Sequence, residues 1–375
     1  MKKNIYIFVL FLFAGSLLAQ QNTDKALYVN SNRVDVSAHY QNLKIGDTVL
    51  SQIALPINVT IPINMRMTFS LYNGSAFSKY EDTEINGLGD TRVGFRYFIP
   101  GDKFIFRAIA NIPTGKTELD GTQFVLSQIL AQNPLGYPVS YYGQGFNTNL
   151  SLAYATPVSR NTVLGAGLLY SYKGKFMPLE AEHAGEFDPG DEITADIGFE
   201  TRSGNNFRFN FDVLYTLFSK DKMEDIDIFK FGNRLSLFAA FRLKTANINH
   251  SVFMVARIRE NNTLFVEDEE KILKNGSQVD VNYFGTMPLS PVLNLNVKLD
   301  GKFYGKYDQF LGDQLLTTGN ATIIGCTAGV KLLLTDLIST DLNLGYKVGT
   351  ITLPNKDDSS DISGFLANLA FTFRF

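Results

Sequence analysis

The side chains that most often carry out chemistry are few in this chain of 375 residues, and they lie far apart. His39, His183 and His250 share no HxxxH or HxxE spacing, so they predict no metal site. Ser251 beside His250 leaves one candidate nucleophile and base, which would suit an enzyme that acts on lipid. The single cysteine, Cys326, cannot form an internal disulfide and is expected to be a small strand residue. The sequence therefore favours neither an enzyme nor a bound cofactor.

Carboxylates gather in two acidic runs. The members of these runs are Glu180, Glu182, Glu186, Asp188, Asp191 and Glu192, followed later by Glu267, Asp268, Glu269 and Glu270. Carboxylate oxygens can hold Ca²⁺, but neither run has the spacing of an EF-hand loop. We expect solvated charge on exposed loops here, with no dedicated metal site.

Other charged residues alternate with apolar ones, and this alternation indicates the elements that position them. In residues 207–217 the odd-numbered positions are all aromatic or aliphatic, whereas the even-numbered positions include Arg208, Asn210 and Asp212. Residues 365–375 follow the same rule, and residues 293–303 follow it except at Gly301. A period of two residues predicts a strand with one apolar side and one polar side.

The alternating strands are long, and their polar sides are charged. Many of them run for ten residues or more, whereas strands of soluble proteins average about five or six. Soluble sandwiches alternate too, but a charged interior with an apolar exterior is typical of a transmembrane β-barrel. The predicted fold is therefore an all-β, antiparallel, up-and-down transmembrane barrel with short periplasmic turns and long extracellular loops.

We count about 14–16 strands and favour sixteen. The candidate strands are residues 33–40, 50–60, 64–73, 90–99, 103–113, 146–157, 162–172, 191–201, 205–218, 229–243, 247–260, 277–286, 291–304, 321–334, 339–352 and 364–375. The first two are the weakest, and the wall has fourteen strands if they fold inside. Long loops are predicted at 74–87, 113–144, 174–190, 219–228, 261–276, 305–319 and 354–363.

The first residues predict export. Lys2 and Lys3 precede a short apolar core and small residues, which is the pattern of a secretory signal peptide over residues 1–19. Residues 20–32 would be an N-terminal periplasmic segment and residues 33–375 the barrel. No later stretch is apolar for the ~18 residues of a membrane helix, and a net charge of −3 gives no basic footprint for nucleic acid.

The chain ends on Phe375, after a strand whose odd-numbered residues are apolar. Such an ending resembles the signal that the barrel-assembly machinery of Gram-negative bacteria reads. We therefore expect an outer-membrane location, with outer-membrane lipid, lipopolysaccharide and the assembly machinery as partners. Divalent cations could bridge the acidic loops to lipopolysaccharide.

The polar faces supply candidates for a lumen. The candidates for lining and selectivity are Arg66, Arg92, Arg96, Arg107, Arg208, Asp212, Arg234, Arg242 and Asp300, and the same faces carry Asp196, Glu200, Lys298, Lys302, Lys347 and Arg374. They could line a water-filled path and set its selectivity. Alternatively, they form a salt-bridged network that fills the interior. Their basic excess would mildly favour anions if the lumen is open.

The longest predicted loop, residues 113–144, carries apolar residues at helical spacing. Phe124, Leu126, Ile129 and Leu130 would share one helix face, and Pro134 would end the helix. This face could be a patch at the mouth that collects ligands, or a lid folded into the mouth. It could also pack on the rim or into lipopolysaccharide.

Three short motifs carry a family resemblance. They are "ALPINVTIPINMRMTFSLY" (54–72), "GLGDTRVGFRYFI" (87–99) and "IANIPTGK" (109–116). Together they resemble the outer-membrane proteins named for the MetA pathway of phenol degradation, within the wider group of FadL-like channels for hydrophobic compounds. FadL-type channels carry a large N-terminal plug with an Asn-Pro-Ala signature, and this chain departs from them because no Asn-Pro-Ala occurs in it.

The resemblance implies passive uptake of small hydrophobic or aromatic compounds and supplies no catalytic residues. The alternative is a general diffusion porin with a mixed-charge lumen. Gly87, Gly89 and Asp90 are expected to set a tight turn at a strand entry, and no helix follows them as a phosphate site would need.

Overall fold

The structure, a computed structural model, describes residues 31–101, 103–180, 185–266, 269–311, 314–352 and 359–375. The predicted signal peptide lies outside the described residues, as does the predicted periplasmic segment up to residue 30. The first described strand begins at Arg33.

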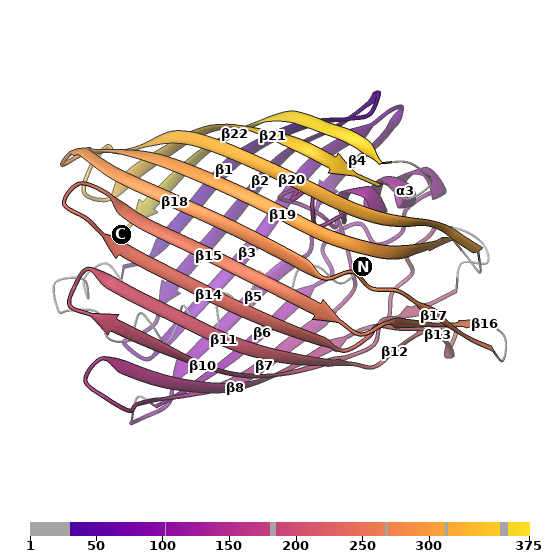
Figure 1. The fold of residues 1–375 in the computed structure, drawn as a ribbon, viewed down its shortest axis with the longest axis horizontal. Helices are drawn as coiled ribbons and strands as arrows, with labels where there is room; N and C mark the ends of the chain where they lie inside the picture. The colour runs from indigo at the N-terminus through magenta and orange to yellow at the C-terminus, as the bar shows by residue number, and fades with distance from the viewer. Residues whose placement is uncertain (1–30, 102, 181–184, 267–268, 312–313, 353–358) are drawn as a thin grey trace.

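Sixteen antiparallel strand positions form one closed wall (Figure 1). The wall strands are β1 (Arg33–Ile45), β2 (Thr48–Pro62), β3 (Met67–Tyr80), β4 (Thr83–Leu88) with β5 (Thr91–Phe98), β6 (Phe104–Ile112), β7 (Asn147–Pro157), β8 (Thr162–Lys173), β10 (Glu192–Ser203), β11 (Phe207–Phe218), β14 (Arg234–Lys244), β15 (Asn249–Arg259), β18 (Gln278–Ser290), β19 (Leu293–Leu311), β20 (Gln314–Leu333), β21 (Ile338–Ile351) and β22 (Ser360–Arg374). β4 and β5 share one position because both pair with β3.

Pairing of β1 with β22 closes the wall along the full length of β1. Asn32 and Phe375 extend this pairing by exchanging two backbone hydrogen bonds of 3.0 and 3.1 Å. Hydrocarbon offers no partner to a free backbone group, so a wall in lipid must have no open edge. The predicted barrel is confirmed with sixteen strands, because β1 and β2 belong to the wall.

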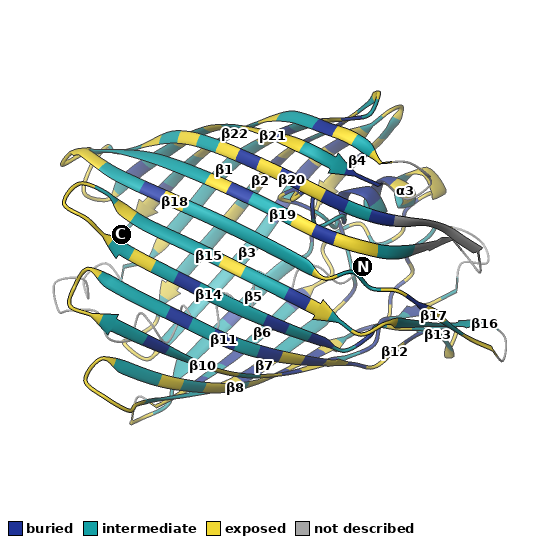
Figure 2. Ribbon diagram, viewed as in Figure 1, coloured by how far each residue is buried: buried dark blue, intermediate teal, exposed yellow. Residues whose placement is uncertain are grey.

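Alternation along each strand separates an outer from an inner face (Figure 2). On β2, Leu50, Gln52 and Ala54 are at most 1% exposed, whereas Ile53 and Leu55 on the opposite face are 48% and 49% exposed. The even-numbered wall residues of β22 face inward, and its outer face carries Phe365, Leu369 and Phe373. Apart from Phe284, which faces inward on β18, the large exposed apolar side chains of the wall strands lie on this outer face, which suits contact with lipid.

Two predicted long loops are wrong. Residues 74–87 continue β3 to Tyr80 and return as β4, while residues 305–311 continue β19 and residues 314–319 belong to β20, which pairs with it. The sequence of the first region is rich in Gly, Ser, Asn and Asp, which usually mark turns. Pairing with the neighbouring strand keeps both regions extended beyond the apolar band.

Three other predicted loops form a small second sheet at the outer end. Its strands are β9 (Phe187–Asp188), β12 (Lys220–Met223), β13 (Ile226–Lys230), β16 (Asn262–Val266) and β17 (Glu269–Leu273). Their order is β17-β16-β13-β12-β9, so each of the three connections contributes to one sheet. Figure 1 shows most of this sheet at the end of the barrel opposite the C-terminus.

The α-helix α3 (Gly121–Leu130) lies between β6 and β7 in the chain, within the predicted loop 113–144. In the described part of the chain, no helix is long and apolar enough to cross a membrane.

Candidate lumen and inner segment

Residues 113–146, here called the inner segment, connect β6 to β7 and fold back into the barrel beside β4 and the outer ends of β20 to β22 (Figure 1). The carboxylate of Asp120 caps helix α3 by accepting a 2.8 Å hydrogen bond from the Gln123 backbone N–H. The helix ends at Leu130, before Pro134, as predicted.

The apolar face of α3 packs onto the inner wall. Leu126 and Leu130 are each 1% exposed and Ile129 is 4% exposed. They belong to one cluster with wall residues of β1, β2, β20, β21 and β22, namely Leu43, Ile45, Leu50, Ala54, Ala321, Ile323, Ile351 and Ile362. Phe124 is half-buried against the same cluster. These side chains are therefore not displayed as an exposed collecting patch, and the helix lies where the other predicted arrangement, a lid folded into the mouth, would place it.

Hydrogen bonds to strand β2 hold the segment after the helix. Gln52 donates a hydrogen bond to the Val139 carbonyl at 2.7 Å and accepts one from the Val139 N–H at 3.0 Å. The Tyr137 hydroxyl donates to the Leu50 carbonyl at 2.7 Å. Burial raises the pKa of Tyr137 well above 10, so this hydroxyl remains a donor at physiological pH.

Two wall lysines bind the same stretch of backbone. Lys302 of β19 donates to the Asn133 carbonyl at 2.8 Å, and Lys347 of β21 donates to the Leu135 carbonyl at 3.0 Å. Gly136 lies so close to them that a Cβ there would stand 2.8 Å from Lys302 Nζ. These lysines therefore fasten the inner segment and do not line an open path at this level.

Asp90 joins the two ends of the inner segment. Its carboxylate accepts hydrogen bonds from the Gly115 N–H at 3.0 Å, the Gln144 N–H at 2.8 Å and the Asn111 side-chain amide at 2.8 Å. We call Asp90, Gly115 and Gln144 the clamp. Thr114 adds contacts of 3.0 Å to the Thr91 N–H and 3.2 Å to the Gly89 carbonyl. The clamp thus brings together the Gly-Leu-Gly-Asp and Pro-Thr-Gly motifs.

Gly115 fits only as glycine. A Cβ on it would stand 1.7 Å from the Tyr142 carbonyl oxygen. Gly87, Gly89 and Asp90 precede β5 as predicted, but the predicted tight turn is wrong, because β4 and β5 both run antiparallel to β3. The chain there leaves β4 after Leu88 and enters β5 at Thr91 within one strand position, and Asp90 of the clamp lies in this break.

Eight of the nine lumen candidates lie on the inner face. The strand registers place Arg92, Arg96, Arg107, Arg208, Asp212, Arg234, Arg242 and Asp300 there. Arg66 is the exception, because it lies exposed in the turn between β2 and β3. The predicted inner position of Arg66 is wrong, since the alternation of β3 begins only at Met67.

Several of these charges are neutralised on the wall. Arg208 lies 3.4 Å from Glu200, and Asp300 lies 3.5 Å from Lys298. Arg257 and Asp280, on neighbouring strands β15 and β18, form a further ion pair. Arg234 stacks 5.1 Å above the ring of Phe218, and Arg242 lies 5.9 Å from that of Phe253. Parts of the inner wall are therefore a salt-bridged and cation–π network.

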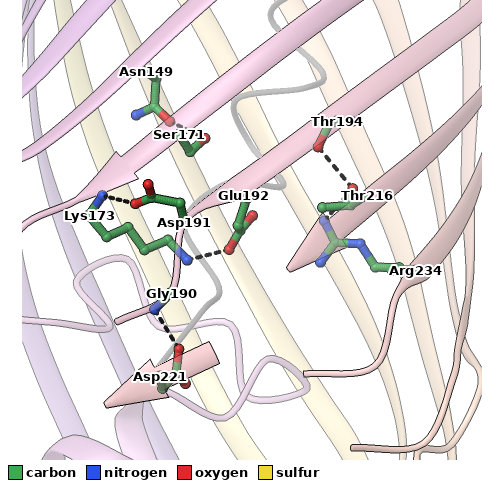
Figure 3. Close-up of polar contacts among 10 residues, drawn as sticks. All are labelled: Asn149, Ser171, Lys173, Gly190, Asp191, Glu192, Thr194, Thr216, Asp221 and Arg234. Carbon is green, nitrogen blue, oxygen red and sulfur yellow. Dashed lines mark hydrogen bonds and ion pairs between the residues drawn. The ribbon is translucent and has the colours of Figure 1, made fainter. Parts of the chain in front are cut away.

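The last two residues of the first acidic run, Asp191 and Glu192, bind Lys173 at the end of β8 (Figure 3). The Asp191 carboxylate accepts a hydrogen bond from the Lys173 N–H at 3.0 Å, and the Lys173 ammonium pairs with Glu192, which is 2% exposed. Asp221 accepts a hydrogen bond from the Gly190 N–H at 2.6 Å. The predicted solvated charge is wrong for Asp191 and Glu192, while Glu182, Glu267 and Asp268 lie outside the described residues.

The histidines do not form a site. His39 faces inward on β1, whereas His250 lies on the outer face of β15, 2.9 Å from the Tyr283 hydroxyl. Ser251 points to the opposite face from His250, so the two cannot act as nucleophile and base. His183 lies outside the described residues. Within the described ranges, no three or more His, Cys, Asp or Glu side chains are grouped to hold a metal ion.

The barrel is closed, has sixteen strands, and carries an apolar outer face and a charged inner face. Its short turns lie at the end where β1 begins and β22 ends. These features define the bacterial outer-membrane β-barrel as its class. The chain therefore crosses the outer membrane with its strands.

No family model matches the chain, and no curated protein matches it at a significant level. Similar solved structures include a bacterial polysaccharide outer membrane secretin, with 12% identity over 92% of this chain and 99% of that chain and a TM-score of 0.48. The CymD monoaromatic hydrocarbon channel has 10% identity over 92% of this chain and 89% of that chain, with a TM-score of 0.45. The outer membrane channel DcaP of Acinetobacter baumannii has 10% identity over 92% and 96%, with a TM-score of 0.43. At these scores, the fold assignment rests on the strand pairing itself.

Proposed function

We propose that this barrel is a channel for passive uptake of small hydrophobic or aromatic compounds. The observation that carries the proposal is the apolar packing of the inner segment against the outer half of the inner wall, with Leu126, Leu130 and Leu135 at most 1% exposed. A pore for water-soluble solutes needs a continuous polar path, whereas an apolar lid favours solutes that can replace apolar contacts.

The sequence motifs support the same proposal. The Gly-Leu-Gly-Asp and Pro-Thr-Gly stretches, which carry the resemblance to the MetA-pathway group, are the stretches that form the clamp. The resemblance thus falls on residues that position the lid, and transport of hydrophobic compounds is what it implies.

A general diffusion porin is the second candidate, because charged side chains cover much of the inner face. The pairs Arg208–Glu200 and Arg257–Asp280 would flank an aqueous path if one exists beside the inner segment. In this case the inner segment would act as a constriction.

Conductance and uptake separate the two candidates. Purified, heat-modifiable protein in a planar bilayer should show little steady conductance, and cells that express it should accumulate radiolabelled naphthalene faster than vector controls. A deletion of residues 121–130 should raise conductance while the barrel stays heat-modifiable. Large ohmic steps from the unaltered protein, with free passage of arabinose into proteoliposomes, would overturn the proposal in favour of the porin.

Lipopolysaccharide contact at the outer loops and recognition of Phe375 by the barrel-assembly machinery are part of the same proposal. Phe375 is 66% exposed at the closure of the wall, where an assembly factor could reach it during insertion.

A further inference from the structure

One row of side chains crosses four neighbouring strands on the inner wall. Thr68 of β3 pairs with Arg96 of β5, Arg96 with Arg107 of β6, and Arg107 with Ser151 of β7. The registers point all four inward. The row therefore brings two guanidinium groups and two hydroxyls together on one patch of the wall.

The two arginines of this row lack an acidic partner. In the described part of the chain neither Arg96 nor Arg107 forms an ion pair, in contrast to Arg208 and Arg257 elsewhere on the wall. Arg96 donates to the Thr68 hydroxyl at 3.0 Å, but its buried Nε has no hydrogen-bond partner in the ranges that the structure describes. Arg107 is only 8% exposed. Two like charges held side by side away from bulk water repel each other, and an anion placed between them would remove this cost.

Ser151 has a spare hydrogen-bonding group at the same place. Ser151 is 5% exposed, and its Oγ has no hydrogen-bond partner among the described residues. A hydroxyl buried without a partner is uncommon in a native structure. It can donate to an oxygen that the arginines also bind.

Aromatic rings border the row on the inner face. The Arg96 guanidinium lies 5.2 Å from the centre of the Phe98 ring, and the Arg92 guanidinium lies 5.5 Å from that of Tyr72. Arg96 is five residues along β5 from Thr91 at the clamp, roughly 16 Å toward the periplasmic end. A solute that has passed the inner segment would meet this patch next.

We propose that Arg96 and Arg107 bind the carboxylate of a small aromatic acid, with Ser151 as a further donor and Phe98 beside the ring. Guanidinium groups suit this role because their paired N–H donors match the two oxygens of a carboxylate. The proposal rests on the proposed function and narrows its substrate class from hydrophobic compounds to amphipathic aromatic acids.

Equilibrium dialysis of the folded protein in detergent tests the site without requiring transport. The probes are radiolabelled benzoate and, as a neutral analogue of similar size, benzyl alcohol. Arg96→Gln and Arg107→Gln should each weaken benzoate binding about tenfold, because each removes a charge-assisted hydrogen-bond donor, and both should leave benzyl alcohol binding unchanged. Arg107→Lys keeps the charge but loses the paired donors, and it should bind benzoate more weakly than the unaltered protein.

Arg66→Gln is the matched control, because Arg66 lies exposed in a periplasmic turn and should not affect binding. Heat-modifiable migration confirms that each variant is folded. Equal binding of benzoate and benzyl alcohol by the unaltered protein, or unchanged benzoate binding by the double Gln variant, would overturn the site. A channel that binds benzoate as expected but transports no naphthalene would instead contradict the proposed function.

Discussion

The Lys347 ammonium donates a 3.0 Å hydrogen bond to the Leu135 carbonyl, across 212 positions of the chain. Gln41 donates to the same carbonyl at 2.9 Å, and Lys302 binds the nearby Asn133 carbonyl. Lys347 is only 6% exposed, so the dipole of the Leu135 carbonyl helps to compensate its charge. The inner segment and the far wall of the barrel therefore stabilise each other.

Replacing both lysines should free the lid. Lys302→Met with Lys347→Met keeps much of the side-chain volume but removes two donors. The Leu135 carbonyl keeps its hydrogen bond from Gln41, whereas the Asn133 carbonyl loses its lysine donor, at a cost of about 1–3 kcal/mol. We expect more frequent opening and a higher mean conductance in planar bilayers. Lys331→Met is the control, because Lys331 faces inward but pairs with Asp341 at 3.4 Å, near the periplasmic end of β21. The same rise in the control would show that lost charge, and not the lid contacts, is responsible.

The clamp should depend on both carboxylate oxygens of Asp90. Asp90→Asn turns one acceptor oxygen into a donor that faces the Gly115 or Gln144 N–H groups. We expect a loss of about 1–3 kcal/mol of local stability and faster amide hydrogen exchange across residues 113–146, with the wall strands unaffected. Asp82→Asn in the exposed β3–β4 turn is the control. Unchanged exchange in Asp90→Asn would mean that the clamp does not hold the segment.

The barrel could be predicted from the sequence because its signal is local. Each wall strand meets lipid on one face, so alternation appears in every strand without knowledge of its neighbours, and all sixteen predicted positions lie in the wall. Arg66 shows the limit of this rule. The apolar–polar alternation of β3 continues in the sequence into the turn before Met67. A period of two residues does not indicate where strand pairing ends.

The inner segment and clamp could be predicted only in part. Helical spacing predicts which face of α3 is apolar. It does not predict what that face packs against, because Leu43 and Ile323 are far away in sequence. The clamp joins Asp90 to groups 25 and 54 positions later. An acidic residue beside Gly89 at a strand entry, with a Pro-Thr-Gly at the end of a neighbouring strand, was the available signal. No comparable sequence signal predicts the five-stranded outer sheet, because its strands come from three separate connections.

Gly115 should tolerate no side chain. In Gly115→Ala the new methyl would overlap the Tyr142 carbonyl, which is backbone and cannot rotate away. We expect a loss of about 1–3 kcal/mol, typical of overpacking, and a lower urea midpoint for loss of heat-modifiable migration. Gly121→Ala is the matched control, because no described residue outside its own helix and its chain neighbours lies within 4 Å of the added Cβ, and Gly121 is the first residue of α3. A Gly115→Ala barrel as stable as the Gly121→Ala barrel would contradict the close approach.

The cap of α3 should make the lid sensitive to acid. The Gln123 N–H and the Thr122 hydroxyl donate to the Asp120 carboxylate and hold the pKa of Asp120 below its ordinary value of 3.8. Because the folded-state pKa is lowered, the cap stabilises the helix fully above the ordinary pKa and is lost as the pH falls through the folded-state value. We expect amide exchange in the first turn of α3, corrected for its intrinsic pH dependence, to rise as the pH falls below 3.8. Asp120→Asn keeps a capping oxygen without a titrating group, so its exchange should not change over the same range. An identical acid response in Asp120→Asn would assign the effect to another group.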